Sequence, residues 1–530
     1  MDRLRINYKD LLSFREAVCQ SLSHVFRELP GASRLTDETI MASTNHNFFK
    51  TFFLLPAILF LACTSAKNQS DEVLLAQIGE KEISVREFLH RSELAVRPNN
   101  FKNKNTTLNN IIAEKILAGE AECNNKLLYN PVMQGTLKGI KEQLMRDKLH
   151  YEVAVKNVEI DSHEVVNAYK GSMREYELEF YTIQNTELAK KIRAALDSVL
   201  ELSDEIFQGL KETLGKKPVH KVNYKDLDDE VIHESLFAKP LDQGTVIGPF
   251  QLSNGDYFIM KVLNWVDYPL ISGEDQRVRW KKVKEKIHQT KANRLWRSFQ
   301  TTIMKGKRIE FNKQSFYGLS NWAMAKLLSS NESDSLNFQI TEIPSAEPEI
   351  NLDAPFFTID NKLWTVGDFK KELMSHPLVF RTKYLDRKNF HEQLKFAIVD
   401  MMMDHYLTQE AYKRSLDRVE VINKTVEMWK DAYLAIGQQK SIINSALAQG
   451  IINENDQPGI RKYWKSYLLE LQKKYSNSIR VNYEALDKLS LTNIDYVAIR
   501  PGVPYPIAVP TFPTLVLSAN LDYAKQKEWN

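Results

Sequence analysis

The sequence predicts a mainly α-helical protein made of two similar helical modules, the first of which is interrupted by an α+β domain. The main observation is a pattern of strand, turn, strand and helix start at residues 74–88, which occurs again at residues 357–369. Segments with the apolar spacing of amphipathic helices follow both occurrences. With 26% charged residues, 19 glycines and 18 prolines, the composition is that of a globular, helix-rich protein. A chain of 530 residues is long enough for about three to four domains.

Each copy of the repeated pattern begins with two short apolar strands joined by a tight turn. Gly79 can supply a turn position with positive φ at no steric cost, and Asp360 is the matching turn former in the second copy. Ser84 and Thr365 occupy matching helix N-cap positions, where a side-chain oxygen can accept a hydrogen bond from the first turn. An acidic residue and a phenylalanine follow each cap at the same spacing. We therefore expect a β-hairpin that leads into a helix in both copies.

Longer amphipathic helices are expected downstream of each hairpin. Apolar residues recur with helical spacing from Leu108 in the first copy and, in the same register, from Ile398 in the second. Helix breaks are expected at residues 130–131, where the sequence is Asn-Pro, and near Gly135 and Gly139. The helical part of the first copy is therefore expected to contain more than one helix.

A third similarity marks the place where each copy closes. Residues 296–311 and residues 464–482 have a similar pattern of aromatic and apolar residues. Both segments end in an alternating stretch that is typical of a strand. We expect each closing helix and strand to complete the copy to which it belongs. The resulting boundaries are a first helical module at 74–170 and 275–320, an inserted domain at 171–270, a linker rich in Ser, Asn, Glu and Pro at 329–353, and a second helical module at 354–492.

Residues 41–63 have the pattern of an export signal. Lys50 precedes a 12-residue apolar run from Thr51 to Ala62, which is too short to cross a bilayer as a helix. The run ends in Leu-Ala-Cys and polar residues follow, so the segment resembles a bacterial lipoprotein signal peptide with its lipobox. The resemblance implies that Cys63 becomes the acylated first residue; the alternative is a buried hydrophobic helix. Residues 1–40 are then expected to be either an over-extended reading frame or a disordered leader. Residues 64–73 are expected to be a polar tether between the lipid and the folded part.

The end of the inserted domain carries its most informative motifs. The pattern Leu-x-x-Gly-x-x-x-Gly-Pro-Phe occupies residues 241–250, and Gly-x-Tyr-x-Ile-x-Lys-Val occupies residues 255–262. A helix start with Asp161 or Ser162 as its cap precedes them. The order of these pieces resembles the parvulin family of peptidyl-prolyl isomerases, and the flanking repeats resemble the chaperone module of SurA- and PrsA-like periplasmic foldases. The resemblance implies two SurA-N-like helical chaperone modules, the first carrying an inserted parvulin-like domain.

The parvulin resemblance also implies where a substrate site lies. Family members carry two histidines that face each other across the floor of the site, and the matching positions here hold Phe180 and Phe258. A phenyl pair cannot make the hydrogen bonds that an imidazole pair makes. The family's Gly-Gly-x-Leu-Gly loop is absent, and residues 217–229 stand in its place. We expect weak or no isomerase activity and no confident catalytic residue. The predicted proline slot is lined by Phe180, Phe250, Tyr257 and Phe258.

Other chemistries find little support in the sequence. A net charge of +3 does not mark a nucleic-acid binder. The stretch 277–297 is rich in Lys and Arg, and we expect its basic side chains to form a solvated helix face rather than a nucleic-acid helix. The opposite face is expected to be an apolar stripe of Trp280, Val283, Ile287, Leu295, Phe299 and Ile303. The three cysteines allow neither a disulfide framework nor a metal cluster. The histidines that lack a partner at metal spacing include His163, His233, His391 and His405.

Three consecutive methionines, residues 401–403, lie beside Asp400 and Asp404 in the predicted second module. A helix that packs into the core explains them, because the run falls on a helical apolar pattern. The alternative is an adaptable surface for partner chains, since methionine side chains fit irregular apolar shapes.

The resemblance implies a lipid-anchored folding chaperone in the periplasm, with the outer membrane favoured over the inner one. Its partners would be unfolded envelope or outer-membrane polypeptides, captured through apolar surfaces, and the membrane itself through the lipid anchor. No cofactor, metal or nucleic acid is expected. The alternatives are an active peptidyl-prolyl cis-trans isomerase and a structural lipoprotein subunit of an envelope assembly. The Pro-rich tail at residues 493–530 is expected to be extended or disordered, because so many prolines exclude helices and central strands.

Overall fold

The computed structural model is mainly helical with small antiparallel sheets, which confirms the predicted class of a mainly α protein with an α+β part. The residues that it describes are 73–92, 99–123, 128–198, 203–214, 219–225, 229–251, 257–329, 339–340, 343, 350–381, 385 and 387–490. The predicted leader, the signal peptide with Cys63, all of the tether except Val73 and the Pro-rich tail lie outside these residues and stay predictions.

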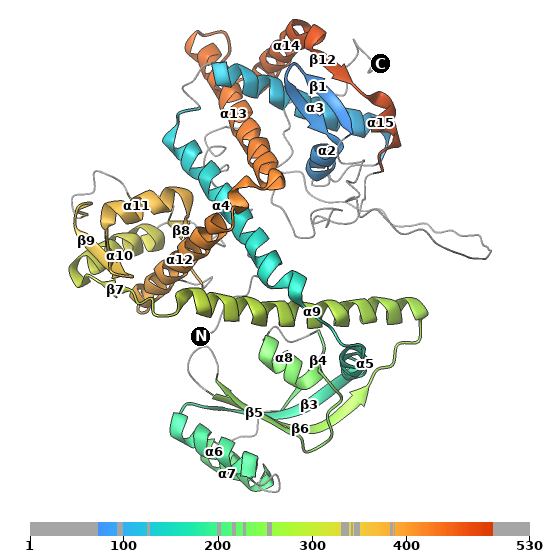
Figure 1. Cartoon of the computed structure of the whole chain (residues 1–530), viewed down its shortest axis with the longest axis vertical. Helices are drawn as coiled ribbons and strands as arrows, with labels where there is room; N and C mark the ends of the chain where they lie inside the picture. The colour runs from blue at the N-terminus through green and yellow to red at the C-terminus, as the bar shows by residue number, and fades with distance from the viewer. Residues whose placement is uncertain are drawn as a thin grey trace, which may run out of the picture. The chain divides into compact units, whose positions relative to one another are not determined.

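The described residues fall into two compact units (Figure 1). The first, here called the sheet unit, contains Lys148–Gly306. The second, here called the repeat unit, contains the described residues of Leu11–Asp147 and Lys307–Asn530. The chain therefore passes from the repeat unit into the sheet unit and back again.

The sheet unit is built on a four-stranded antiparallel sheet with the strand order β4-β3-β6-β5. Successive side chains of a strand point to opposite faces. One face of this sheet carries Tyr176 and Leu178, and the other carries Tyr181. Helices bury apolar side chains on both faces, which explains why the middle and end of β3 are apolar on both sides although its first half carries three glutamates on the Tyr181 face. The strands are β3 (Arg174–Ile183), β4 (Val219–Asn223), β5 (Val246–Gln251) and β6 (Tyr257–Asp267).

Helices cover both faces of this sheet (Figure 1). They are α5 (Ser162–Gly171), α6 (Thr186–Ser198), α7 (Ser203–Leu214), α8 (Glu230–Phe237) and α9 (Gly273–Met304). Leu236 and Phe237 of α8 pack on the face that carries Tyr176, and α6 and α7 cover the opposite face. Val283 of α9 packs against α5. As predicted, Asp161 caps α5, where its side chain accepts a hydrogen bond from the backbone N–H of His163.

The repeat unit contains two three-stranded sheets of the same topology, β12-β1-β2 and β7-β9-β10. In each sheet the first strand of a hairpin is central, and a strand from far along the chain pairs with its outer edge. The predicted turns are confirmed, because Gly79 and Asp360 both have positive φ. The predicted caps are also confirmed: Ser84 accepts from the first turn of α2, and Thr365 forms a capping box in α11. The hairpin strands are β1 (Leu74–Ile78), β2 (Lys81–Ser84), β9 (Pro355–Ile359) and β10 (Lys362–Thr365).

The closing strands are exchanged relative to the prediction. β12 (Ile479–Val481), expected to close the second copy, pairs with β1 of the first copy, with Val481 opposite Ala76. β7 (Glu310–Phe311), expected to close the first copy, pairs with β9 of the second. The expectation that each copy closes with its own strand is therefore wrong. Both closing strands are short and alternate in the same way, so the local pattern does not distinguish the two hairpins.

The helices of the repeat unit follow the same exchange. The repeat unit has two hydrophobic cores: the first surrounds the hairpin β1–β2, and the second surrounds the hairpin β9–β10. α13 lies along α3 and contributes Ala435 to the first core, together with Trp464 of α14. α4 packs instead against the end of α11 in the second copy. The helices are α2 (Val85–Ser92), α3 (Phe101–Cys123), α4 (Pro131–Val153, which continues into the sheet unit), α10 (Lys313–Ser329), α11 (Val366–Ser375), α12 (Phe390–Lys413), α13 (Glu420–Ala448), α14 (Gln457–Tyr475) and α15 (Tyr483–Lys488).

Two glycines of α4 allow its close approach to α11. A Cβ atom on Gly139 would lie 2.0 Å from the carbonyl oxygen of Ser375, and one on Gly135 would lie 2.8 Å from that of Met374. The helix break predicted at residues 130–131 is confirmed, because α4 begins at Pro131. The break predicted near Gly135 and Gly139 is wrong, because these glycines serve helix packing inside an unbroken helix.

Part of the predicted linker at 329–353 belongs to the second core. Ile343 is fully buried among the residues of that core. A two-residue strand, β8 (Gln339–Ile340), pairs with β11 (Leu378–Val379). The described residues of this segment are therefore bound to the module that they were expected to precede, because the segment supplies apolar side chains as well as polar ones.

Buried ion pairs match the exchanged helices to their partners. Asp431 of α13 lies 2.7 Å from Lys81 and 3.1 Å from Lys115 of the first copy. Arg146 of α4 donates a 2.7 Å hydrogen bond to Thr408 and lies 3.8 Å from Asp404, both on α12 of the second copy. The Asp431 carboxylate thus meets two lysines of the first copy, and the Arg146 guanidinium meets a carboxylate of the second. Moving either helix to the other copy would leave its buried charge without this partner, which is unfavourable.

Candidate functional site

An aromatic cluster on the α8 face of the sheet is the part of the predicted slot that the structure brings together. The rings of Phe180 on β3 and Phe258 on β6 have centroids 5.4 Å apart. Phe250 on β5 lies opposite Phe258 in the strand ladder and packs on the same core. All three side chains are half-buried, so part of each ring is open to solvent. We call Phe180, Phe250 and Phe258 the aromatic cluster.

Tyr257, the fourth residue predicted for the slot, lies on the opposite face of the sheet. It packs with the core under α6 and α7, whereas the aromatic cluster packs with the core under α8. The prediction is wrong at this position because adjacent residues of a strand point to opposite faces. Tyr257 and Phe258 cannot line the same surface.

His220 on β4 adds an imidazole that the sequence interpretation did not include. Its ring stands edge-on to Phe180, with centroids 6.1 Å apart and an interplanar angle of 78°. It is exposed and lies opposite Leu178 in the ladder between β3 and β4. The residue was missed because 217–229 was interpreted as a replaced loop rather than as a strand next to β3. Residues 219–222, Val-His-Lys-Val, do not alternate apolar and polar side chains, so the two valines are only a weak signal for this strand.

The aromatic cluster can offer apolar contact and one nearby imidazole to a bound chain. The two phenylalanines at the positions of the family's histidines do face each other, at the ring distance given above. Phenyl rings neither donate nor accept protons, so His220 is the titratable side chain that touches the cluster in the ring contacts of the described residues. No group of three His, Cys, Asp or Glu side chains among the described residues could hold a metal ion.

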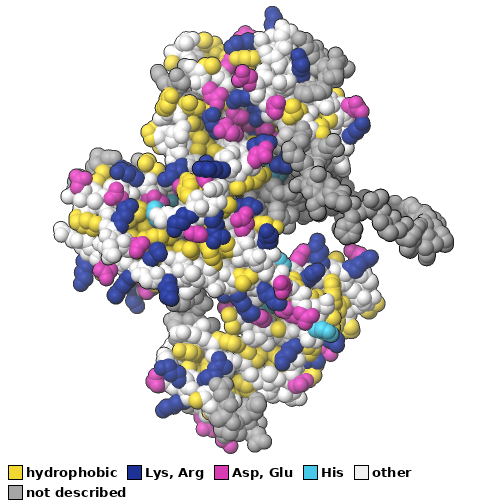
Figure 2. Space-filling view, in the orientation of Figure 1, with side chains coloured by type: hydrophobic (Ala, Val, Ile, Leu, Met, Phe, Trp, Pro, Cys, Tyr) yellow, Lys and Arg dark blue, Asp and Glu magenta, His cyan; other side chains and the backbone are white. Residues whose placement is uncertain are grey.

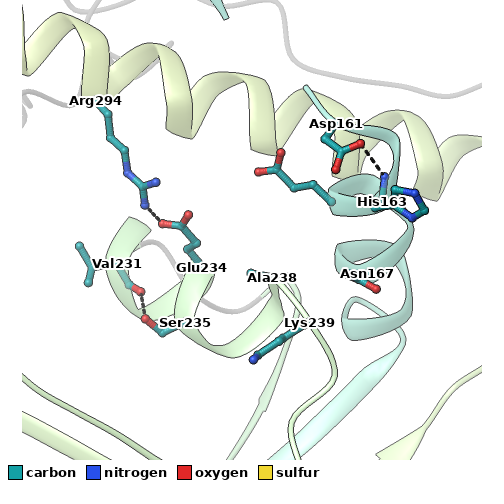
Figure 3. Close-up of a pocket in the computed structure, with 10 residues that line it drawn as sticks. Asp161, His163, Asn167, Val231, Glu234, Ser235, Ala238, Lys239 and Arg294 are labelled. Atoms are coloured by element: carbon teal, nitrogen blue, oxygen red, sulfur yellow. Dashed lines mark hydrogen bonds and ion pairs between the residues drawn. The ribbon is translucent and has the colours of Figure 1, made fainter. Parts of the chain in front are cut away.

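A second hollow of the sheet unit, about 650 Å³ in volume, lies between α5, α8 and α9 (Figure 3). Figure 3 shows Arg294 of α9 reaching Glu234 of α8 across one side of it, and these two side chains form an ion pair. Glu164 of α5 pairs with Lys291 of α9. Several charged side chains that line this hollow are thus already paired with residues of the same unit. The remaining lining residues are Asp161, His163, Asn167, Val231, Ser235, Ala238 and Lys239.

His233 of α8 is a structural histidine. Burial lowers its pKa to about 4, so the ring is neutral at pH 7. A neutral ring can donate its Nε2–H to a carbonyl, and Nε2 lies 3.1 Å from the carbonyl oxygen of Tyr224. The rings of Tyr224 and Phe237 pack against it and against each other. His233 therefore stabilises the packing of α8 through this hydrogen bond and its ring contacts.

The basic residues of α9 divide into two sets. In the second half, Arg294 and Arg297 pair with Glu234 and Glu230 of α8, so this half is not simply the solvated face that the sequence predicts. In the first half Arg277, Lys281, Lys282 and Lys284 are exposed, whereas Arg279 and Lys286 are half-buried. The predicted apolar stripe is right at Val283, which is fully buried. It is wrong at Trp280 and at Leu295, which are both exposed; Trp296, next to Leu295, is buried instead.

The methionine run of α12 packs in the second core. Met401 and Met402 are buried, which confirms the core interpretation over that of a client surface for these two residues. Two of the histidines that lack metal-binding partners in the sequence lie within hydrogen-bonding distance of other side chains. His405 Nδ1 lies 3.1 Å from a carboxylate oxygen of Glu372, and His391 Nδ1 lies 2.7 Å from the hydroxyl of Ser320.

Comparison with solved structures finds a foldase protein, PrsA from Streptococcus pneumoniae str. Canada MDR_19A. The alignment has 14% sequence identity and a TM-score of 0.17, and it covers 42% of this chain and 91% of the foldase chain. No family model matches the chain, and no curated protein matches it. Among the described residues, the helices are too short or too polar to cross a membrane.

Proposed function

We propose that the chain is a folding chaperone of the bacterial envelope whose sheet unit is a parvulin-like domain with weak or no isomerase activity. The observation that carries the proposal is the aromatic cluster. Three half-exposed phenylalanine rings stand on one face of an antiparallel sheet, at the positions where the parvulin resemblance expects the substrate slot. Aromatic rings bury a large apolar area and accept many side chains, which suits capture of unfolded chains of varied sequence.

The position of β5 supports the same function. β5 is an edge strand of the four-stranded sheet and carries Phe250 of the aromatic cluster. An edge strand presents backbone groups that can pair with an extended peptide whatever its sequence; in β5 this pairing is interrupted at Pro249, which has no N–H, and at the carbonyl of Gly248, which accepts from Arg193. Capture would lower the concentration of free unfolded chains, and aggregation falls steeply with that concentration. This mechanism requires no catalytic residue.

Export and anchoring belong to the proposal as well. The apolar run and Cys63 are consistent with a lipid-anchored protein of the periplasm, with the outer membrane favoured. Incorporation of labelled palmitate into the chain made in a bacterial host tests this part. Label in the wild-type chain and none in the Cys63→Ser variant is the expected result; equal label in both contradicts it.

An active isomerase is the second candidate, and His220 favours it. An imidazole beside Phe180 could polarise the surface on which a twisted prolyl amide would be stabilised. Acceleration of cis-trans exchange in a Pro-containing peptide, lost in His220→Ala, would select this candidate over a chaperone without catalysis.

Aggregation of a thermally unfolded client protein tests the chaperone proposal. Residues 64–530 at an equimolar ratio should suppress light scattering. The double variant Phe180→Ala, Phe258→Ala should bind the client about tenfold more weakly, because it removes two apolar rings. Phe396→Ala is the matched control, since it removes an exposed phenylalanine of the repeat unit. Equal suppression by the double variant and the wild type would refute a role for the aromatic cluster.

A further inference from the structure

The start of α9 presents a basic and aromatic side to solvent. Arg277, Trp280, Lys281 and Lys284 recur at the spacing i, i+3, i+4 and i+7, which places them on one side of the helix. All four are exposed. Val283, which is fully buried, turns a different side of the helix toward α5. Figure 2 shows Lys and Arg side chains close to hydrophobic ones over the end of the sheet unit where α9 begins.

The loop before α9 adds apolar side chains to this surface. Ile271, two residues before the helix, is 97% exposed, and Tyr268 is 56% exposed. Tyr268 is held in place because its backbone N–H donates a 2.8 Å hydrogen bond to the carbonyl of Met173. Trp280 stands beside Tyr169 of α5, with ring centroids 5.5 Å apart. Transfer of such an exposed isoleucine side chain from water into an apolar phase is favourable.

The acidic residues of this helix segment do not cancel its positive charge. Residues 273–287 contain six basic side chains and three acidic ones. Glu274 pairs with Arg277 and Glu285 with Lys281, in contacts that are exposed on both sides and therefore weak. Arg279 points inward, where it donates to the carbonyl of Ser172. The outward side thus remains positive.

We propose that this surface, formed by Tyr268, Ile271, Arg277, Trp280, Lys281 and Lys284 and here called the α9 docking surface, binds an anionic lipid bilayer. Lysine and arginine are attracted to anionic headgroups, and tryptophan and tyrosine are favoured at the membrane interface. Ile271 supplies an aliphatic group for the acyl region. A nucleic acid could pair with the basic residues and stack on Trp280, but it has no apolar phase for Ile271. The proposal does not depend on the chaperone function of the aromatic cluster.

Site-resolved lysine labelling tests the proposal on the full chain. The protein is reconstituted into vesicles of phosphatidylglycerol and phosphatidylcholine, or of phosphatidylcholine alone, and acetylated briefly before mass spectrometry. Lys281 and Lys284 report on the α9 docking surface. Lys190 and Lys191 of α6 are the matched controls, because they are exposed basic neighbours in the same unit.

Acetylation of Lys281 and Lys284 should fall about tenfold or more on the anionic vesicles, while that of Lys190 and Lys191 stays unchanged. Raising the salt concentration to 0.5 M should restore much of the reactivity, because salt screens the attraction. Ile271→Ser should weaken protection of the lysines. Equal reactivity on the two vesicle types, or equal protection of the α6 lysines, would overturn the proposal. Protection by an oligonucleotide and not by anionic vesicles would replace it with nucleic-acid binding.

Discussion

Replacement of Asp431 by asparagine should loosen the contact between α13 and α3. Asp431 is almost fully buried and lies 2.7 Å from Lys81 and 3.1 Å from Lys115. Removing one partner of a buried ion pair costs about 3–5 kcal/mol, because the other charge is left without compensation. Lys115 keeps Glu87 at 2.9 Å and Lys81 keeps Glu122 at 3.4 Å, so we expect a free-energy loss near the lower figure.

Hydrogen exchange measured by mass spectrometry can follow this loss locally. About 3 kcal/mol corresponds to roughly 100-fold faster exchange of the amides of α3 and α13 that open together. The sheet unit is an internal reference and should exchange as in the wild type. Glu427→Gln is the control, because Glu427 makes an exposed contact with Lys430 on the same helix. A change below about fivefold, or one equal to that of the control, would refute the assigned role of Asp431.

The contribution of Asp431 should also depend on pH in one direction. Burial acts to raise its pKa, but Lys115 and Lys81 outweigh burial and hold the pKa below its ordinary value. A carboxyl group with a lowered pKa stabilises the folded state fully above its unfolded value, about 3.9, and loses that contribution as the pH falls through the folded value. The difference between the wild type and Asp431→Asn should therefore be constant from pH 7 to about 5 and should shrink only near pH 4 and below.

Two further predictions concern packing and buried histidines. Gly139→Ala should destabilise the repeat unit by about 2 kcal/mol or more in urea unfolding, because its Cβ would overlap the carbonyl of Ser375; Gly119→Ala, which meets nothing within 4 Å, should be neutral or stabilise by up to about 1 kcal/mol. A loss of stability in both variants alike would contradict the close approach of α4. Burial lowers the pKa of His150 and of His233 to about 4 each. The sheet unit should therefore lose stability as the pH falls from about 6.5 to 4, because these histidines bind protons in the unfolded chain but not in the folded unit. The double substitution of both histidines by glutamine should flatten that dependence in a pH series of thermal unfolding, and an unchanged slope would contradict it.

The hairpins of the repeat could be predicted from the sequence because their signals are local. Turn formers with positive φ, a cap and an acid in the first turn lie within a dozen residues of each other, and the structure has them at Gly79, Ser84, Asp360 and Thr365. The partners of the hairpins could not be predicted in the same way. Which strand reaches which edge depends on contacts between residues hundreds of positions apart, including the charge match of Asp431 and Arg146 to opposite copies.

The candidate site was predictable in part for a similar reason. Phe180, Phe250 and Phe258 follow from motif order, and the structure places them together. The alternation of strand side chains was sufficient to exclude Tyr257. His220 required knowledge that residues 219–223 form a strand beside β3, and the motif that would have located that segment is replaced in this chain. A resemblance identifies residues that match its pattern and is silent about those that are new.

The exchange of closing strands has a consequence for the order in which the protein can fold during synthesis. The described residues of the sheet unit form one continuous stretch, which can fold as soon as Gly306 has left the ribosome. The hairpin at residues 74–84 is synthesised early, but the free edge of β1 can pair only after Ile479–Val481 has been synthesised, almost 400 residues later. A premature stop before Ile479 would thus damage the start of the chain, and during synthesis the early strands must be kept from foreign partners until their own arrives.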